Sequence, residues 1–323
     1  MTGTDTPKRG VVGLGPVPAE VVTPILGADF AFIDAPEQSD LQTAEAAIVR
    51  AAVSLGEAEF AQMPQLRLVV RSGVGYDSID LDAAQRAGVA VAITPGTNTN
   101  AVAEGAFAHI LHLIKNLGPF TELMRRGGWD ERVNHTVGDL EGATVGIIGY
   151  GRIGQRMQAL AEAFGMTVHA HDPIADVPAR LRADFDDLLA ASDIVSVHVP
   201  LLPDTRNLIS TAEIAAMRPG ALLINVSRGG IVDEDAAFDG LRSGHLGGVG
   251  LDVFSPEPPS DHPLFHHEKT VLSPHMMGLS TRASRANYTA AAQAIRSFFG
   301  GGTDHTLVAE PYEDTVETER ATP

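Results

Sequence analysis

Residues 144–154 read TVGIIGYGRIG, and this stretch decides the fold of the chain. An apolar run, Val145–Ile148, leads directly into three glycines, Gly149, Gly151 and Gly154, at the expected start of a helix. In such a turn the first glycine permits the tight bend, the second lets the backbone approach a pyrophosphate, and the third lets the helix pack on the strand. The helix N-terminus then offers free N–H groups to the anion. The stretch predicts a dinucleotide-binding turn, and a glycine-rich turn that binds nothing is the alternative.

An acidic residue follows at the distance that this interpretation requires. Asp172 comes directly after a predicted strand, Thr167–His171, and 23 residues after Gly149. A carboxylate there accepts both ribose hydroxyls of an adenosine and repels a 2′-phosphate. The nearest basic residues that follow, Arg180 and Arg182, lie several positions away. We therefore predict NAD as the cofactor in preference to NADP.

Short apolar runs alternate with helical stretches on both sides of this turn, which predicts parallel sheets covered by helices. In the N-terminal part we expect strands at Val11–Leu14, Phe30–Ile33, Ala46–Val49, Arg67–Arg71 and Val89–Ile93. Further along we expect strands at Thr144–Gly149, Thr167–His171, Ile194–Val199, Ala221–Val226, Val249–Phe254 and Thr270–Leu272. The predicted fold class is α/β with two lobes, a Rossmann doubly wound parallel sheet inserted into a flavodoxin-like α/β lobe.

Two long helices are expected beside these strands. Ala101–Gly127 is predicted as one helix that reaches from lobe to lobe, with a break at Gly118-Pro119. Thr281–Phe299 is predicted to pack back on the first lobe, which makes that lobe discontinuous in sequence. The predicted domains are therefore residues 1–115 plus 283–323, and residues 116–282. The tail from Gly300, rich in glycine and acidic residues, is expected to be loose.

Composition excludes several classes of protein. The chain has 323 residues, 23 Lys and Arg against 41 Asp and Glu, a formal charge of −18, and no cysteine. Such an acidic chain is repelled by nucleic acid and by anionic membranes. The lack of cysteine rules out disulfides and thiolate metal sites. We expect no signal peptide, no membrane span and a cytoplasmic location.

Five segments together resemble the D-isomer-specific 2-hydroxyacid dehydrogenase family, and most closely its short phosphoglycerate-dehydrogenase-like members. They occur in the family's order and spacing between about residues 66 and 282. The segments are RSGVGYD at 71–77, NTNAVAE at 98–104, NVSRGGIVD at 225–233, DVFSPEP at 252–258 and SPHMMG at 273–278. The resemblance implies an NAD-dependent enzyme that interconverts a 2-oxo acid and a D-2-hydroxy acid.

The resemblance implies a catalytic trio. Arg228 would hold the carboxylate and carbonyl oxygen of the substrate, because a guanidinium donates two parallel hydrogen bonds. His275 would exchange a proton with the substrate oxygen, and Glu257 would orient the imidazole and favour its protonated form. The three residues follow successive predicted strands, at the edge where open α/β sheets bind ligands. Taken singly, each residue also has a purely structural interpretation. Arg228 could form a surface ion pair, Glu257 could be a turn residue, and His275 could be a buried structural histidine.

The resemblance also implies the residues that surround the trio. On the substrate side it points to the N–H groups of Val74 and Gly75 and to Asn98. Arg71 would face a second anionic group on the substrate, or would simply extend from a strand end. The implied cofactor residues are Gly149, Gly151, Arg152, Ile153, Gly154, Asp172, Pro200, Ser227 and Asp252. Asp252 is expected to bond the nicotinamide amide, and the region of Trp129 is expected to support a homodimer.

Several histidines could suggest other chemistry. His262, His266 and His267 lie near acidic residues, but a solvated loop is favoured over a metal site. His109 and His112 are three residues apart on the expected long helix and are interpreted as packing between the lobes. A rival function is an NAD(H)-sensing binding protein without physiological turnover. An L-2-hydroxyacid dehydrogenase is disfavoured, because its nucleotide motif lies near the N-terminus.

Overall fold

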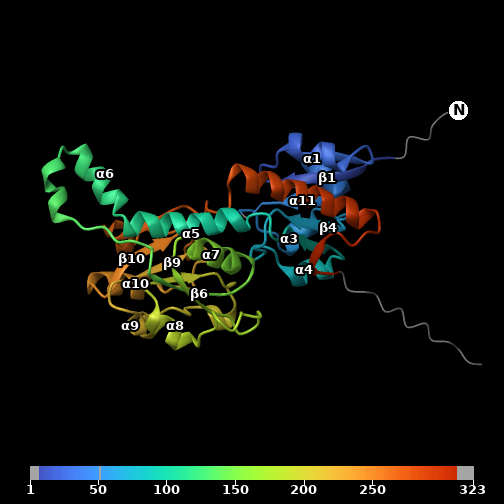
Figure 1. Ribbon diagram of the computed structural model, residues 1–323. Coiled ribbons are helices and arrows are strands. Elements are labelled where there is room, and N and C mark those ends of the chain that lie inside the picture. Colours follow the sequence, from blue (N-terminus) through green and yellow to red (C-terminus); the bar gives the residue numbers. More distant parts are fainter. Residues whose placement is uncertain (1–6, 51, 311–323) are drawn as a thin grey trace, which may run out of the picture. The chain divides into compact units, whose positions relative to one another are not determined.

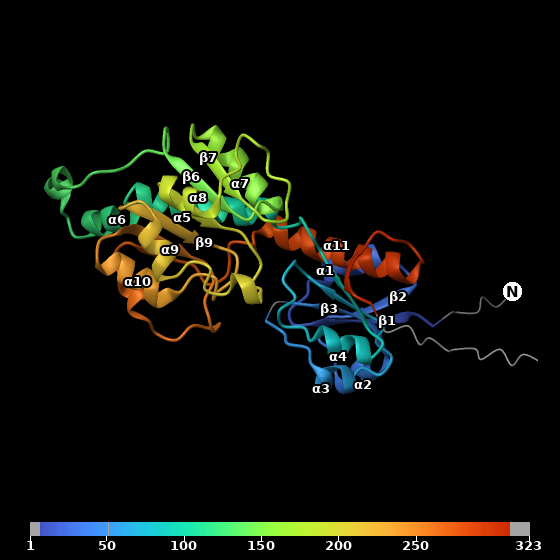
Figure 2. The ribbon, with the colours of Figure 1, turned by 90° about the horizontal axis from the view of Figure 1, so that it is seen from below.

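The structure is a computed structural model that describes residues 7–50 and 52–310 (Figures 1 and 2). The chain forms two compact units. One consists of the residues up to Asn98 together with those from Thr281 onward, and the other consists of Thr99–Ser280. The first unit is therefore discontinuous in sequence.

The second unit is built on a six-stranded parallel sheet with the order β11-β10-β9-β8-β6-β7. Its strands are β6 Thr144–Ile148, β7 Thr167–His171, β8 Ile194–Val197, β9 Ala221–Asn225, β10 Leu246–Leu251 and β11 Thr270–Leu272. Arg182 adds an isolated parallel bridge to Ala170 in β7. Counting this bridge as a reduced third strand, the order becomes 3-2-1-4-5-6 plus one edge strand, which is the Rossmann order.

Helices cover both faces of this sheet and bury an apolar layer on each side (Figure 1). On one face lie α5 Thr99–Ile114 and α7 Arg152–Ala163, and on the other lie α8 Phe185–Ala191, α9 Thr211–Ala216 and α10 Glu234–Arg242. α5 packs on α7, β9 and β10. This packing explains why the boundary falls between Asn98 and Thr99, whereas the sequence placed it at residue 115.

The first unit contains a sheet with the order β12-β5-β4-β3-β1-β2. Its strands are β1 Arg9–Leu14, β2 Phe30–Ile33, β3 Ala44–Val49, β4 Leu68–Arg71, β5 Ala90–Ile93 and β12 Thr306–Ala309. The five N-terminal strands are parallel and follow the flavodoxin-like order 2-1-3-4-5, as predicted. The helices are α1 Ala19–Leu26, α2 Gln38–Thr43, α3 Glu57–Ala61, α4 Leu81–Arg86 and α11 Thr281–Phe299. α1 and α11 cover one face, and α3 and α4 cover the other.

The expected helix Ala101–Gly127 is two helices, α5 and α6 (Leu117–Arg125), and the break lies before the Gly118-Pro119 position at which the sequence placed it. The helical geometry is interrupted at Asn116, which has a left-handed φ of 52°. Pro119 does not cause the break, because it lies in the first turn of α6, where a missing N–H leaves no intrahelical bond unmade. A short 3₁₀ helix, Trp129–Asn134, follows α6.

One further prediction, the bounds of β10, needs correction. β10 runs from Leu246 to Leu251 rather than from Val249 to Phe254. The missed part contains Gly247 and Gly248, and a Cβ built on Gly248 would lie 2.9 Å from Leu113 of α5. Glycine therefore stands in the strand where the helix approaches closely.

The tail from Gly300 is not wholly loose. Thr306–Ala309 forms β12, which pairs antiparallel with β5. The acidic run beyond it lies outside the described residues.

Candidate active site

The glycine-rich turn between β6 and α7 has the geometry of an anion-binding loop. Gly149 has a φ of +95°, and a Cβ there would lie 2.7 Å from the carbonyl of His198. A Cβ on Gly154 would lie 2.1 Å from the Gly149 oxygen, so only glycine lets α7 approach. A Cβ on Gly151, by contrast, would meet no described atom within 4 Å. Open space therefore lies at the N-cap of α7, where a pyrophosphate would meet the free N–H groups, including those of Arg152 and Ile153.

Asp172 follows β7 and faces the same turn. Its Oδ2 accepts from the N–H of Tyr150 at 2.7 Å, and its Oδ1 accepts from those of Ile174 and Ala175 at 2.8 Å each. Burial by itself raises the pKa of Asp172, but the three backbone donors outweigh it and the net pKa is lowered. The carboxylate is thus held ionised and fixed in direction. Arg180 and Arg182 pair with Glu162 and Asp176.

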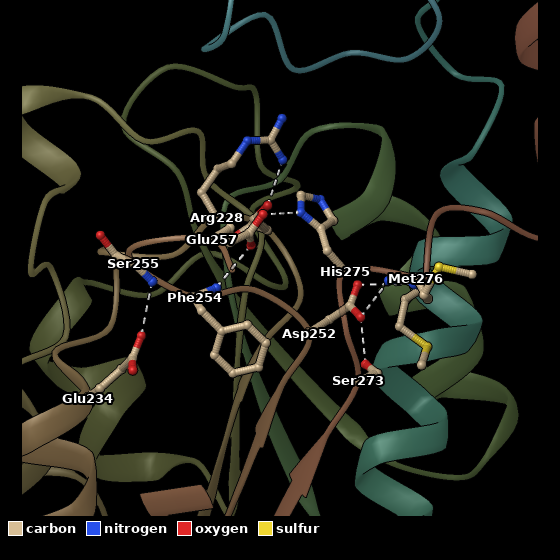
Figure 3. Close-up of polar contacts among 11 residues, drawn as sticks. Arg228, Glu234, Asp252, Phe254, Ser255, Glu257, Ser273, His275 and Met276 are labelled. Atoms are coloured by element: carbon tan, nitrogen blue, oxygen red, sulfur yellow. Dashed lines mark hydrogen bonds and ion pairs between the residues drawn. The ribbon is translucent and has the colours of Figure 1, made fainter. Parts of the chain in front are cut away.

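The predicted trio gathers at the carboxyl ends of β9, β10 and β11 (Figure 3). The Nδ1 of His275 lies 2.7 Å from Oε2 of Glu257, and Oε1 of Glu257 accepts from the N–H of Phe254 at 3.0 Å. Arg228 donates from Nη1 to the carbonyl oxygen of Ser227 at 2.6 Å. The imidazole and the carboxylate are 40% and 36% exposed, so a small molecule can reach them.

Asp252 has a role that its sequence position did not reveal. Its carboxylate is 1% exposed and accepts hydrogen bonds from Ser273 Oγ and from the N–H groups of Met276 and Met277. Its backbone oxygen accepts from the N–H of His275 at 2.8 Å. Through these hydrogen bonds Asp252 fixes the backbone of the turn that contains His275.

The other predicted cofactor residues border the same edge of the sheet. Pro200 follows β8, and its carbonyl oxygen accepts from Thr205 Oγ1 at 2.6 Å. Ser227 follows β9, and its N–H and hydroxyl both donate to Oδ1 of Asn225. The carboxyl ends of parallel strands lie at one edge of a sheet. Residues that follow different strands could therefore be predicted from the sequence to lie near one another.

The predicted substrate residues lie on the first unit, after β4 and β5. Val74 is 42% exposed, and the loop before it is fastened by the N–H of Gly73, which donates to Thr94 Oγ1 at 2.7 Å. Arg71 is 7% exposed, and its Nη1 donates to the carbonyl oxygen of Ser72 at 2.7 Å. A Cβ on Gly73 would lie 3.4 Å from that Nη1, so the guanidinium packs against the loop at Gly73. Asn98 is half-buried at the end of this unit.

His109 of the second unit has a polar partner that the sequence did not indicate. His109 in α5 was interpreted as packing between lobes, but its Nε2 lies 3.1 Å from Ser273 Oγ within the same unit. The three-residue spacing of His109 and His112 indicated which face of the helix they share, but not the hydrogen-bond partner of His109.

The remaining histidines occupy other surroundings. His262 and His266 pair with Asp235 and Asp261 at 3.0 and 2.7 Å. His198 is buried beside Ser196, and burial lowers its pKa to about 3.

Comparison with known proteins decides the family. Residues 107–277 match the family model described as D-isomer specific 2-hydroxyacid dehydrogenase, NAD binding domain. The chain belongs to this family. The resemblance carried by the five motifs is thereby confirmed, and so is NAD as the cofactor of this domain. The chain is a member of a family of NAD-dependent oxidoreductases.

Individual relatives agree with this assignment. The D-3-phosphoglycerate dehydrogenase of Mycobacterium leprae is 38% identical over 280 residues, which are 84% of this chain and 53% of that protein. The chain thus spans about half the length of the curated relatives it matches.

Solved structures extend the similarity to nearly the whole chain. A glyoxylate reductase from Paecilomyes thermophila has a TM-score of 0.83 at 27% identity, covering 94% of this chain and 99% of that one. The D-lactate dehydrogenase of Aquifex aeolicus, in complex with NAD and lactic acid, has a TM-score of 0.81 at 27% identity, covering 93% and 99%. Both confirm the predicted fold class.

Proposed function

We propose that the protein is an NAD-dependent dehydrogenase that interconverts a 2-oxo acid and the corresponding D-2-hydroxy acid. The observation that carries this proposal is the 2.7 Å pair of His275 Nδ1 and Glu257 Oε2 beside Arg228, on the strand ends of an NAD-binding domain. Family membership supports the reaction class.

The surroundings of the glycine-rich turn fit the cofactor. The open space at Gly151 and the N-terminus of α7 suit a pyrophosphate, and the ionised Asp172 suits a ribose with free hydroxyls. Pro200 and Ser227 would border the nicotinamide end. The Oδ2 of Asp252 accepts a single hydrogen bond from the described residues, so a nicotinamide amide would find a remaining lone pair there.

Bound NADH would supply the hydride, and the chain's own residues would handle the proton. Glu257 accepts a hydrogen bond from the Nδ1–H of His275, so Nε2 is the ring nitrogen left to exchange a proton with the substrate oxygen. Nε2 would donate during reduction and accept during oxidation, while the carboxylate stabilises the imidazolium. Arg228 would bind the substrate carboxylate and carbonyl oxygen, with Ser227 fixing one side of the guanidinium. On the first unit, Val74, Gly75 and Asn98 remain the proposed substrate-binding residues.

We also propose that the protein acts as a homodimer in the cytoplasm. α6 and the 3₁₀ helix that follows it expose apolar side chains. Met124, Trp129 and Val133 among them are 55, 57 and 76% exposed. Phe120, Leu123, Met124, Trp129 and Arg132 line a cavity of about 210 Å³ there. A second copy would cover this apolar surface. Within the described residues no helix is long and apolar enough to cross a membrane.

The proposed activity is tested by following NADH oxidation optically against a panel of 2-oxo acids. The panel contains glyoxylate, pyruvate, hydroxypyruvate, phenylpyruvate and phosphorylated analogues. We expect turnover with at least one member, and a loss of roughly 100-fold or more in kcat for His275→Ala with little change in NADH affinity. Turnover that is independent of His275 would refute the mechanism. NADH binding without turnover on any panel member would favour the sensor.

A further inference from the structure

A chain of hydrogen bonds runs from α5 to the turn that carries His275. The Nε2 of His109 lies 3.1 Å from Ser273 Oγ, and that hydroxyl donates to Oδ1 of Asp252 at 2.5 Å. Because the Ser273 proton goes to the carboxylate, the Ser273 oxygen must accept from His109. The imidazole therefore carries its proton on Nε2.

The far end of this chain fixes three consecutive backbone groups. The N–H of His275 donates to the Asp252 backbone oxygen, while those of Met276 and Met277 donate to the two carboxylate oxygens at 2.9 and 3.0 Å. His275 has a φ of +54°, a left-handed conformation that a residue other than glycine rarely adopts. The Asp252 carboxylate, shown in Figure 3, thus binds the two backbone N–H groups that directly follow this left-handed residue.

The surroundings of His109 keep it a neutral donor. The residue is 3% exposed, and its Nδ1 has no hydrogen-bond partner among the described residues. Burial lowers its pKa and outweighs Asp252, which raises it, while His112 lowers it further. A protonated ring would leave a second N–H unpaired beside Gly250 of β10, where a built Cβ would lie 3.0 Å from Nδ1.

We propose that His109 is a positioning residue for His275, acting through Ser273 and Asp252. Its Nε2–H donates to the Ser273 oxygen and so orients that hydroxyl. The hydroxyl in turn orients the carboxylate of Asp252, and the carboxylate fixes the turn that contains His275. This inference rests on the proposed function insofar as His275 is the proton-exchanging group. All four residues belong to one unit, so the arrangement needs no movement of the other.

Two substitutions of His109 separate a donor from a packing residue. His109→Leu keeps apolar volume against β10 and removes the donor, whereas His109→Gln keeps an N–H that can reach Ser273. A residue that serves packing alone would tolerate leucine and gain nothing from glutamine. His112→Leu, the same change one turn along α5, is the matched control.

The experiment measures kcat, KM and NADH affinity together with amide hydrogen exchange at Met276 and Met277. We expect His109→Leu to lower kcat on the order of 10- to 100-fold with NADH affinity retained, because small displacements of a reacting group are costly. We expect faster exchange at both amides, restoration of kcat and exchange by His109→Gln, and near-normal values for His112→Leu. In a Ser273→Ala background, His109→Leu should cause no further loss.

The outcomes also separate this inference from the proposed function. Hydrogen exchange needs no substrate, so faster exchange in His109→Leu with no turnover by the wild type would reject the function and retain the positioning. Unchanged exchange at Met276 and Met277 in His109→Leu would overturn the inference. Equal losses in the leucine and glutamine variants would overturn it as well, because the donor would then be irrelevant.

Discussion

The Nδ1 of His275 lies 2.7 Å from Oε2 of Glu257, while Oε1 of the same carboxylate accepts from the N–H of Phe254. Both carboxylate oxygens are thus engaged, and the imidazole can rotate only by breaking its bond. This relationship fixes the ring tautomer, and in the proposed mechanism it leaves Nε2 to exchange the proton with the substrate. It also places a negative charge beside the imidazolium that proton uptake creates.

The first prediction removes that charge. Glu257→Gln is expected to lower kcat on the order of 10- to 100-fold, because an amide no longer stabilises the imidazolium. NADH affinity should stay unchanged, since Glu257 belongs to the proton-exchanging pair. Glu234→Gln is the matched control: Glu234 accepts from the N–H of Ser255 at 3.2 Å, and glutamine retains an acceptor. Steady-state kinetics decide the matter, and full kcat in Glu257→Gln would contradict the assigned role.

The second prediction uses two glycines of one turn with different surroundings. Gly154→Ala is expected to destabilise the fold by about 1–3 kcal/mol or more, since its Cβ would lie 2.1 Å from the Gly149 oxygen. Gly151→Ala should fold normally, because its Cβ would meet no described atom within 4 Å. It should nevertheless lose NADH binding, because the methyl group fills the approach to the helix N-terminus. Thermal unfolding with and without NADH measures both effects, since a ligand that binds the native state raises Tm. Normal NADH stabilisation of Gly151→Ala would show that the pyrophosphate lies elsewhere.

The third prediction concerns cofactor choice at Asp172. Asp172→Asn is expected to weaken NADH binding and to reduce the discrimination against NADPH, because the repulsion of a 2′-phosphate is lost. Because the pKa of Asp172 is lowered, this discrimination should persist as pH falls below the usual range of a carboxyl group, and it should be lost only as pH passes through the lowered pKa. Fluorescence titrations with both cofactors from neutral to mildly acidic pH provide the measurement. An unchanged ratio of affinities in Asp172→Asn would mean that another group selects the cofactor.

A fourth prediction distinguishes two roles of Arg71. The buried guanidinium beneath Gly73 favours a role in holding the substrate loop, and Arg71→Ala should then raise KM for all 2-oxo acids alike. If Arg71 instead met a second anionic group, KM would rise for phosphorylated substrates and stay constant for glyoxylate. Comparing KM values for the two kinds of substrate decides between the roles.

Much of this site could be predicted because parallel strands end at one edge. The family resemblance singles out Arg228, Glu257 and His275, and the strand order explains why the structure brings all three to one edge of the sheet. The pairing of His109 with Ser273 could not be predicted in this way, because 164 residues separate them and the packing of α5 on the sheet brings them together.

Two features of the fold escaped prediction for related physical reasons. The four-residue strand β12 gains its partner from β5, far away in sequence, and has little pattern of its own. The break at Asn116 depends on a single left-handed residue, while the neighbouring Gly118-Pro119 gave a stronger but misplaced signal.

The last prediction concerns stability in acid. His198 is buried, its Nε2 bonds to Ser196 Oγ at 2.8 Å, and burial lowers its pKa to about 3 from 6.5. Between these values the unfolded chain binds a proton that the folded chain does not. The folded state is therefore favoured above pH 6.5 and loses stability as pH falls toward 3, by up to about 1.4 kcal/mol per pH unit from this residue.

His198→Gln, which keeps a polar partner for Ser196 and cannot be protonated, should flatten this loss. His266→Gln, at an exposed histidine that pairs with Asp261, is the control and should leave the loss as steep as in the wild type. Urea unfolding at a series of pH values from 7 to 4.5 gives the slopes. Identical slopes for His198→Gln and the wild type would show that the buried imidazole gains access to water before the domain unfolds.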